Sequence, residues 1–273
     1  MPVIDDLIYD VGMHNGDDTA LYLARGFRVV AIEANPVLAE LGAKRFAPEL
    51  AAERLQILNV GVGADDAVAD FWVNDDNDEY SSFVKEVGCR NGSACHPVQV
   101  RCVPFARILE QHGVPYYMKV DIERADVHCL RGLDRADRPR YVSVEAHSLE
   151  YLCILSELGY DRFKCVDQLS HNHPGYRPDN ESLRGRLRSA WVHAWRELAR
   201  RGLGRKPTLN GHHFPLGSSG PFGEETAGEW QSLEEVAYSW LHHELGHRKR
   251  GQINMRGWFD FHATIASPAE RDA

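Results

Sequence analysis

Residues 10–17 of this chain read DVGMHNGD, and this short stretch decides the fold that the sequence predicts. It ends a β-like run, Leu7 to Asp10, and the acids Asp17 and Asp18 can cap a helical pattern that follows directly. The glycines at positions 12 and 16 let the backbone turn sharply and approach a ligand closely. The stretch therefore predicts a strand–turn–helix unit whose turn can bind a ligand.

An acidic residue at the end of the next β-like run narrows the ligand. The second predicted strand, Arg28 to Glu33, stops at Asn35-Pro36, and an acid in this place can bind a ribose diol. The turn reads Asp-x-Gly-x-x-x-Gly, so it lacks the pyrophosphate turn of the dinucleotide pattern Gly-x-Gly-x-x-Gly. Asp10 would repel a phosphate and attract an ammonium or sulfonium. The residues favour a cationic amino-acid cofactor; taken alone, the turn could also be an ordinary strand–turn–helix with capping acids.

Short β-like runs alternate with helical patterns over the first two-thirds of the chain, which indicates an α/β fold with a mostly parallel sheet. Further strands are predicted at 55–60, 68–73, 98–103, 117–122, 141–145, 160–166 and 258–265. Helices are predicted at 105–111, 127–130, 148–158, 187–198 and 232–245. Residues 74–97 are polar and rich in turn-forming types, which predicts a long functional loop.

The composition changes after Asp167. Residues 168–256 are rich in His, Arg, Gly, Pro and aromatic side chains, and they separate the last two predicted strands. We interpret them as an insertion that forms a lid for substrate recognition within one domain of residues 1–273. Most of the aromatic residues there are expected to pack the insertion's own core.

Five ordered motifs resemble the FkbM-type methyltransferases. They are the stretch at 10–17, AIEANP at 31–36, the serine pair at 81–82, MKVDIE at 118–123 and VSVEAH at 142–147. The resemblance covers about residues 6 to 166. It implies a class I methyltransferase (Rossmann-like) fold, a seven-stranded sheet whose last strand is antiparallel. It also implies methyl transfer from S-adenosylmethionine, usually to a hydroxyl of a sugar, polyketide or other small metabolite.

The same resemblance assigns the cofactor contacts. It implies that the methionine end is held by Asp10, Gly12, Asn15 and Gly16, and that Glu33 accepts the ribose hydroxyls with Ala34 and Asn35 beside the adenosine. The other expected cofactor residues are Asp17, Asn59, Gly61, Ser81 and Ser82. One departure is visible, because the chain has Arg124-Ala125-Asp126 where the family usually has Gly-x-Glu. A local change of turn is expected there.

Polar residues at two later strand ends are candidates for catalysis. Ligands of open α/β sheets bind outside the carboxyl ends of the strands. Asp121 and Glu123 end one predicted strand, and Glu145 and His147 end the next. We expect His147 or Asp121 to act as general base for an alcohol, with Glu123 and Glu145 as orienting acids. The acids and His147 could instead cap helices, and a Mg²⁺ site is possible but not favoured.

Residues 243–247 carry a competing motif, His243-Glu244-Leu245-Gly246-His247, which matches the His-Glu-x-x-His pattern of zinc peptidases. The positions that would complete the extended zinc motif hold Arg250 and Ile253. With 14 histidines in the chain, a five-residue match can arise by chance, so we do not favour a metal site. A zinc peptidase and a catalytically silent adenosyl-cofactor binder remain the alternatives to a methyltransferase.

The composition of the whole chain limits its partners. The formal net charge is −9 over 273 residues, which argues against a nucleic-acid partner. Neither a membrane span nor a signal peptide is recognisable, so a cytoplasmic location and a small-molecule substrate are expected. The six cysteines show no metal-like pairing and are expected to be reduced core thiols. The oligomeric state cannot be read from the sequence.

Overall fold

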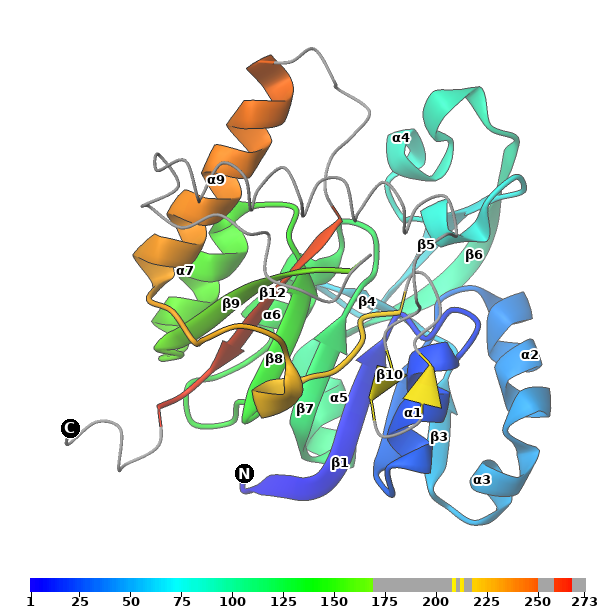
Figure 1. Ribbon diagram of the computed structural model, residues 1–273. Coiled ribbons are helices and arrows are strands. Elements are labelled where there is room, and N and C mark those ends of the chain that lie inside the picture. The colour runs from blue at the N-terminus through cyan, green and yellow to red at the C-terminus, as the bar shows by residue number, and fades with distance from the viewer. Residues whose placement is uncertain (169–207, 210–211, 214–217, 250–257, 267–273) are drawn as a thin grey trace. The chain divides into compact units, whose positions relative to one another are not determined.

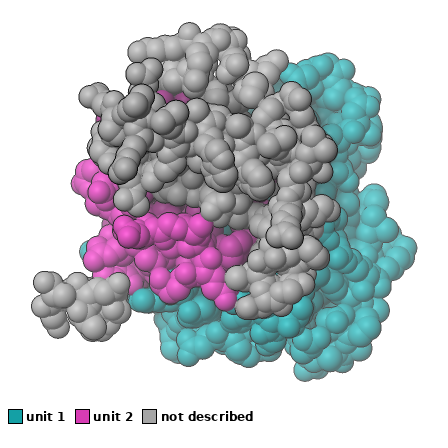
Figure 2. Space-filling model, viewed as in Figure 1, with its two compact units in different colours: residues 1–144 teal, residues 145–273 magenta. Residues whose placement is uncertain are grey.

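The computed structural model describes residues 1–168, 208–209, 212–213, 218–249 and 258–266. The chain forms two compact units, residues 1–144 and residues 145–273 (Figure 2). That both belong to a single methyltransferase domain over residues 1–273 stays a prediction.

The first unit is built on five parallel strands in the order β3-β2-β1-β7-β8 (Figure 1). The strands are β1 (Val3–Val11), β2 (Arg28–Ile32), β3 (Leu55–Leu58), β7 (Val114–Val120) and β8 (Tyr141–Glu145), whose last residue opens the second unit. The central strands β1 and β7 are almost fully buried from Leu7 and Val114 onward. Both faces of a parallel sheet are covered, which explains why these strands read as continuous apolar runs.

The longer helices of the first unit are α1 (Asp17–Ala24), α2 (Pro36–Arg45), α3 (Ala47–Ala51), α5 (Phe105–His112) and α6 (Asp126–Arg131). The first residues of α1, α5 and α6 lie within one residue of the predicted starts, whereas α3 was not predicted. The left-handed Gly16 precedes α1. Asn35 caps α2, because its Oδ1 accepts a hydrogen bond from the Val37 amide at 3.0 Å, and Pro36 occupies the first helical position.

A second, smaller sheet of three strands has the order β4-β6-β5. Its strands are β4 (Gly61–Gly63), β5 (Ala67–Asn74) and β6 (Cys95–Pro104), and the segment between β5 and β6 holds the short helices η1 (Asp78–Tyr80), α4 (Lys85–Gly88) and η2 (Arg90–Gly92). Figure 1 shows this sheet and α4, in cyan, at the end of the unit towards which the arrow of β1 points. The predicted long loop is thus shorter than expected, because β6 pairs with β5 as far as Asn74↔Cys95.

The second unit contains an antiparallel pair, β9 (Arg162–Asp167) and β12 (Phe259–Thr264), in register from Phe259↔Asp167 to Thr264↔Arg162. Its other described elements are α7 (Leu149–Glu157), β10 (Thr208–Leu209), β11 (His212–His213), η3 (Gly223–Glu225) and α9 (Leu233–Lys249). Ser148 caps α7, since its Oγ accepts a hydrogen bond from the Glu150 amide at 3.1 Å.

The strand order of the large sheet is β3-β2-β1-β7-β8-β12-β9, with β12, the last strand of the chain, antiparallel. This confirms the predicted α/β class I methyltransferase fold. The insertion before the final strand is confirmed as well, since 91 residues, 168–258, separate β9 from β12. Much of it, including the helix predicted at 187–198, lies outside the described residues. None of the helices that the structure describes is long and apolar enough to cross a lipid bilayer.

The prediction that all cysteines are reduced is wrong for one pair. Cys89 and Cys95 form a disulfide, because the turn at η2 lies between the end of α4 and the start of β6 and leaves their Cα atoms 5.4 Å apart. Cys102, Cys129 and Cys165 are buried free thiols, as expected.

Candidate functional site

The glycine turn after β1 requires a glycine for two reasons. Gly12 has φ +87°, a left-handed conformation that favours glycine. A Cβ added there would lie 1.9 Å from the carbonyl oxygen of Asp121, which follows β7. The amides of Gly12 and Met13 both donate to the carbonyl oxygen of Ile32, at 2.9 and 3.1 Å. Three strand ends, those of β1, β2 and β7, therefore meet at this turn.

A buried charge network lies directly beneath the turn. Lys119 Nζ donates to Asp10 Oδ1 at 3.1 Å and to the carbonyl oxygen of Gly12 at 2.8 Å, and it lies 3.6 Å from Asp18 Oδ2. Thr19 Oγ1 donates to the other carboxylate oxygen of Asp10 at 2.6 Å. Burial alone would lower the pKa of Lys119, but the nearby carboxylates outweigh it and raise this pKa well above its ordinary value. Lys119 therefore stays charged and ties the turn to β1, β7 and α1.

Glu33 lies immediately after β2 and is buried. Its Oε2 accepts a hydrogen bond from the His14 amide and its Oε1 from the Asn35 amide, each at 2.8 Å. Burial raises the pKa of this carboxyl above its ordinary value, although both backbone hydrogen bonds oppose the shift. Each carboxylate oxygen has a second acceptor position, so Glu33 can accept two further hydrogen bonds from neighbouring hydroxyls.

The residues predicted around Glu33 brace its backbone. Asn59 Nδ2 donates to the carbonyl oxygens of Glu33, at 2.8 Å, and Ala34, at 3.2 Å. Asn35 is buried and caps α2. The loop that carries Glu33 is therefore fixed by the end of β3 and the start of α2.

The next predicted contacts form the start of α1. Asn15 Oδ1 accepts a hydrogen bond from the Asp17 amide at 2.9 Å, and Arg45 Nη1 bonds both the Asn15 carbonyl oxygen and Asp17 Oδ1. Gly16 has φ +82°, and a Cβ there would lie 2.6 Å from the Phe46 ring. The turn is thereby held against α2.

Ser81, Ser82 and Gly61 have structural partners. Ser81 Oγ accepts the Asn74 amide at 3.1 Å, and Ser82 Oγ donates to the carbonyl oxygen of Glu123 at 2.8 Å. A Cβ on Gly61 would lie 2.3 Å from the Phe83 ring. Ser82 therefore joins the segment after β5 to the turn after β7, whereas Ser81 and Gly61 hold that segment against the small sheet.

The segment after β7 has an unusual backbone. Glu123 and Arg124 both have left-handed φ angles, +49° and +84°. Asp126 accepts the amides of Ile122 and Arg124, each at 3.1 Å, and so closes the turn before α6. Arg124 stands where the resembled family usually has glycine, which is the residue this conformation favours. Arg124 therefore adopts a conformation that is unfavourable for a residue with a Cβ.

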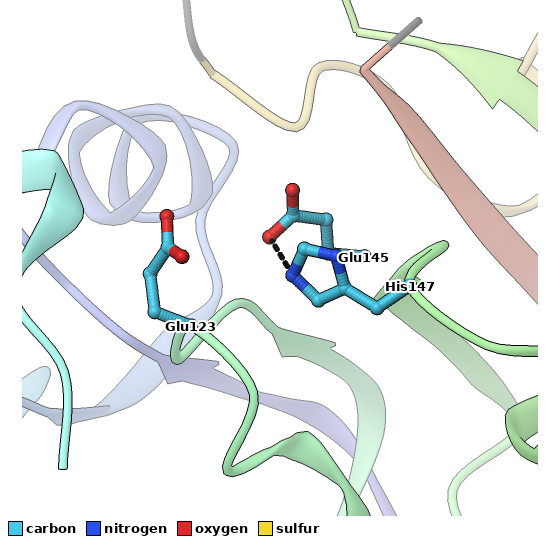
Figure 3. Close-up of side chains that lie close together, drawn as sticks. All are labelled: Glu123, Glu145 and His147. Carbon is cyan, nitrogen blue, oxygen red and sulfur yellow. Dashed lines mark ion pairs between the residues drawn. The ribbon is translucent and has the colours of Figure 1, made fainter. Parts of the chain in front are cut away.

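Glu145 and His147 lie together after β8, at the start of the second unit. Nε2 of His147 lies 2.8 Å from Oε2 of Glu145 (Figure 3), and the His147 amide donates to the Glu145 carbonyl oxygen. Ser148, and not His147, caps α7. Val144 is the register partner of Val120, so Asp121 and Glu145 each follow the last paired residue of neighbouring parallel strands.

Sequence reasoning assigned no role to Lys119, Arg90 or His14. Lys119 could have been noticed, since it is the one charged residue in the apolar run YYMKV of β7. Arg90 Nη2 donates to Glu123 Oε2 at 2.6 Å, and His14 Nε2 lies 3.0 Å from Asp78 Oδ1. The first contact joins residues that are 33 positions apart in the sequence, and the second joins residues that are 64 positions apart. A local sequence pattern cannot predict either contact.

The competing motif lies on α9, as its spacing predicts. The side chain of His243 is buried and packs edge-on against the Phe259 ring, with ring centroids 4.6 Å apart. Among the side chains that the structure describes, no group able to hold a metal ion includes His243. The side chains of Glu244 and His247 lie outside the described residues.

A comparison with protein families gives one match. The model of the methyltransferase FkbM domain matches residues 10–162, which is more than half of the chain. The match runs from Asp10 at the end of β1 to Arg162 at the start of β9 and so contains every predicted cofactor and catalytic residue. No curated protein is similar enough to count as a match.

Two solved structures show distant likenesses to this chain. A precorrin-6y C5,15-methyltransferase from Geobacter metallireducens is 13% identical, with a TM-score of 0.34 over 61% of this chain and 70% of the other. The O-methyltransferase of a trans-AT PKS multienzyme of Brevibacillus brevis, in complex with S-adenosyl-L-homocysteine, is 11% identical, with a TM-score of 0.35 over 72% and 63% of the two chains.

Proposed function

The chain belongs to the FkbM methyltransferase domain family, and on that premise we propose that it binds S-adenosylmethionine and methylates a hydroxyl group of a small metabolite, sugar or natural product. The observation that carries the proposal is the pairing of the Gly12 turn with the buried Glu33 carboxylate, which the His14 amide joins at 2.8 Å.

The residues present fit this cofactor. Gly12 has no Cβ, and the carbonyl oxygen of Asp121 lies where one would stand, so the ends of β1 and β7 are in backbone contact at the turn. Glu33 keeps one acceptor position on each oxygen for a ribose diol, beyond the amides it already binds. The carboxylates of Asp10, Asp17 and Asp18 outnumber the two cations paired with them, Lys119 and Arg45, so one net negative charge remains near the turn. This charge suits a sulfonium and an ammonium group and disfavours a pyrophosphate.

We propose that some of the predicted cofactor residues contact the cofactor and that the others support the loops around it. Glu33, Gly12, Gly16 and the backbone of residues 13–15 would contact the cofactor. Asp10 would support the turn without contacting the cofactor, because its side chain is fully buried beneath the turn and accepts hydrogen bonds from Lys119 and Thr19. A second set would likewise support the loops around the cofactor, namely Asn15, Asp17, Ala34, Asn35, Asn59, Gly61, Ser81 and Ser82.

The strand ends supply the acid–base chemistry in this proposal. Bound S-adenosylmethionine provides a methyl group that is already activated by its positive sulfur. The protein has to align the acceptor hydroxyl with it and take up the hydroxyl proton. We propose His147 as general base, because the carboxylate of Glu145 orients its ring and would stabilise the imidazolium. Asp121 is the second candidate, and Glu123 would orient the acceptor.

We further propose that residues 168–256 recognise the acceptor, and that the protein acts in the cytoplasm. The length and aromatic content of this insertion support the first point. Neither point identifies the acceptor, so the decisive experiment has to find it.

Incubation of a metabolite extract with methyl-labelled S-adenosylmethionine tests the function. The wild-type protein is expected to transfer label to one acceptor, and His147→Ala to transfer it about 10²- to 10⁴-fold more slowly with unchanged cofactor affinity. Label transfer that survives both His147→Ala and Asp121→Asn would exclude the proposed bases. Tight cofactor binding without any transfer would indicate a silent binder instead.

A further inference from the structure

The Cys89–Cys95 disulfide closes a short loop that contains Arg90, and the Arg90 side chain binds Glu123 just after β7. The bond closes a ring of seven residues, 89–95, that contains η2 and leads into β6. Inside the ring, Ser93 Oγ donates to the carbonyl oxygen of Arg90 at 2.8 Å, and the Ser93 amide bonds the same oxygen. Asn74, the last residue of β5, binds Ser93 Oγ at 2.6 Å. The backbone around Arg90 is therefore fixed from both sides.

The Arg90 side chain is held along its whole length. Its Nε donates to the carbonyl oxygen of Val87 at 3.0 Å, and its guanidinium carbon lies 3.9 Å from the centre of the Tyr80 ring. Its Nη2 donates to Glu123 Oε2 at 2.6 Å. A planar guanidinium can stack and donate in two directions at once, which a lysine ammonium cannot do.

Glu123 receives support from the same segment at its backbone. Ser82 Oγ donates to its carbonyl oxygen, while Arg90 binds its carboxylate. Glu123 is only 17% exposed and Arg90 30%, so water screens this ion pair less than a surface pair. Since Glu123 has a left-handed φ angle, which is unfavourable for a residue with a Cβ, external contacts have to keep it there.

We propose that Arg90 is a positioning residue for the Glu123 carboxylate, and that the Cys89–Cys95 disulfide holds the turn from which Arg90 acts. The oxidation state of this cysteine pair then controls the order of the end of β7. The consequence for catalysis rests on the proposed function, in which Glu123 orients the acceptor, whereas the link between the disulfide, Arg90 and Glu123 does not.

Formation of the disulfide needs an oxidant, and its cleavage needs a reductant. Oxidation of the two thiols releases two electrons and two protons, which a disulfide such as oxidised glutathione accepts to become two thiols. A dithiol such as dithiothreitol reverses the step and becomes a cyclic disulfide. Cytoplasmic thiol pools keep most cysteines reduced, so in the proposed location the bond would form under oxidising conditions.

Hydrogen–deuterium exchange of the full chain tests the positioning role without any acceptor. We expect amides of residues 121–126 to exchange about fivefold faster in Arg90→Gln, in Cys89→Ser/Cys95→Ser and in wild type treated with dithiothreitol than in oxidised wild type. Arg101→Gln, which removes an exposed arginine of the same small sheet, and Cys153→Ser serve as matched controls. Unchanged exchange at 121–126 in Arg90→Gln would overturn the proposal. Failure of oxidised glutathione to link Cys89 and Cys95, followed by mass spectrometry, would overturn the part that concerns the disulfide.

Transfer of label from S-adenosylmethionine to a metabolite extract gives the second measurement. Arg90→Gln is expected to lower the transfer rate about tenfold while the cofactor Kd stays within twofold, and Arg90→Lys to recover part of the rate. An equal loss of rate in Lys and Gln variants together with weaker cofactor binding would mean that Arg90 only maintains the fold. If wild type transfers no label, the proposed function fails, and the exchange experiment still decides the role of Arg90.

Discussion

The α-carbon of Gly12 lies against the carbonyl oxygen of Asp121, so closely that a Cβ on Gly12 would stand 1.9 Å from that oxygen. The end of β1 and the end of β7 are thus in backbone contact at the turn assigned to the cofactor. Each supplies a part of the candidate site, the glycine turn in one case and Asp121 and Glu123 in the other.

Gly12→Ala should therefore destabilise the protein for two reasons. The left-handed φ of residue 12 is unfavourable for alanine, and the new Cβ would clash with the carbonyl oxygen of Asp121. Gly26 has a similar φ, +90°, but no atom lies within 4 Å of its added Cβ. Gly26→Ala is expected to cost about 1 kcal/mol of unfolding free energy, and Gly12→Ala about 3 kcal/mol more. Urea denaturation of the two variants measures the difference; equal losses would mean that the contact with Asp121 relaxes freely.

Lys119→Met should be among the most damaging substitutions in the first unit. It would leave the carboxylates of Asp10 and Asp18 buried without the ammonium that lies 3.1 and 3.6 Å from them. Breaking a buried charge network by removing one member costs about 4 kcal/mol. Thermal or urea unfolding checks this, with Lys44→Met on the surface of α2 as control. A loss no larger than that of the control would show that water replaces the ammonium.

Arg124→Gly should stabilise the protein. Arg124 has φ +84°, and a left-handed conformation costs a residue with a Cβ about 1 kcal/mol. Arg124→Ala removes the same side chain but keeps the Cβ, so it should bring no gain. A melting temperature that rises in the alanine variant as well would assign the effect to the arginine side chain and not to the backbone.

Glu33→Ala should weaken S-adenosylmethionine binding about 10²-fold, because two charge-assisted hydrogen bonds to the ribose are lost. Glu40→Ala removes an exposed carboxylate of α2 and should leave the affinity unchanged. Calorimetric titration of both variants measures the effect. Equal affinities in wild type and Glu33→Ala would remove the ribose assignment.

Cofactor affinity should also fall at acidic pH. Burial raises the pKa of Glu33 above its ordinary value of 4.5. In the proposed site the ionised form of Glu33 would accept the ribose hydroxyls. This form is lost as the pH decreases through the raised pKa, so affinity should begin to decline above pH 4.5. The Glu33→Gln variant cannot titrate, and its weaker affinity should be independent of pH in the same range. A parallel decline in the variant would place the titrating group elsewhere.

The fold could be read from the sequence because the features that decide it are local. The run Leu7 to Val11, the turn at Gly12 and the acid at Glu33 each have a recognisable pattern, and their order along the chain predicts the sheet. Strand β4 was missed since it has three residues, two of them glycine. Such a segment becomes a strand only when a neighbour, here β6, offers hydrogen bonds.

The supporting contacts of the site could not be read in this way. The ion pair of Arg90 with Glu123 and the disulfide of Cys89 with Cys95 both depend on how residues 75–94 fold back onto the end of β7. The pattern of polar and turn-forming residues there predicts a loop, but it does not predict which residues the side chains of the loop contact. The role of Asp10 changed for the same reason, because only the structure brings Lys119 and Thr19 to its carboxylate.

Calorimetric titration of the purified full chain with S-adenosylmethionine and, separately, with NAD⁺ tests the central claim most directly. The cofactor site assigned to Gly12 and Glu33 predicts one S-adenosylmethionine bound per chain and no measurable heat with NAD⁺. Binding of NAD⁺ in its place, or no binding of S-adenosylmethionine, would contradict it.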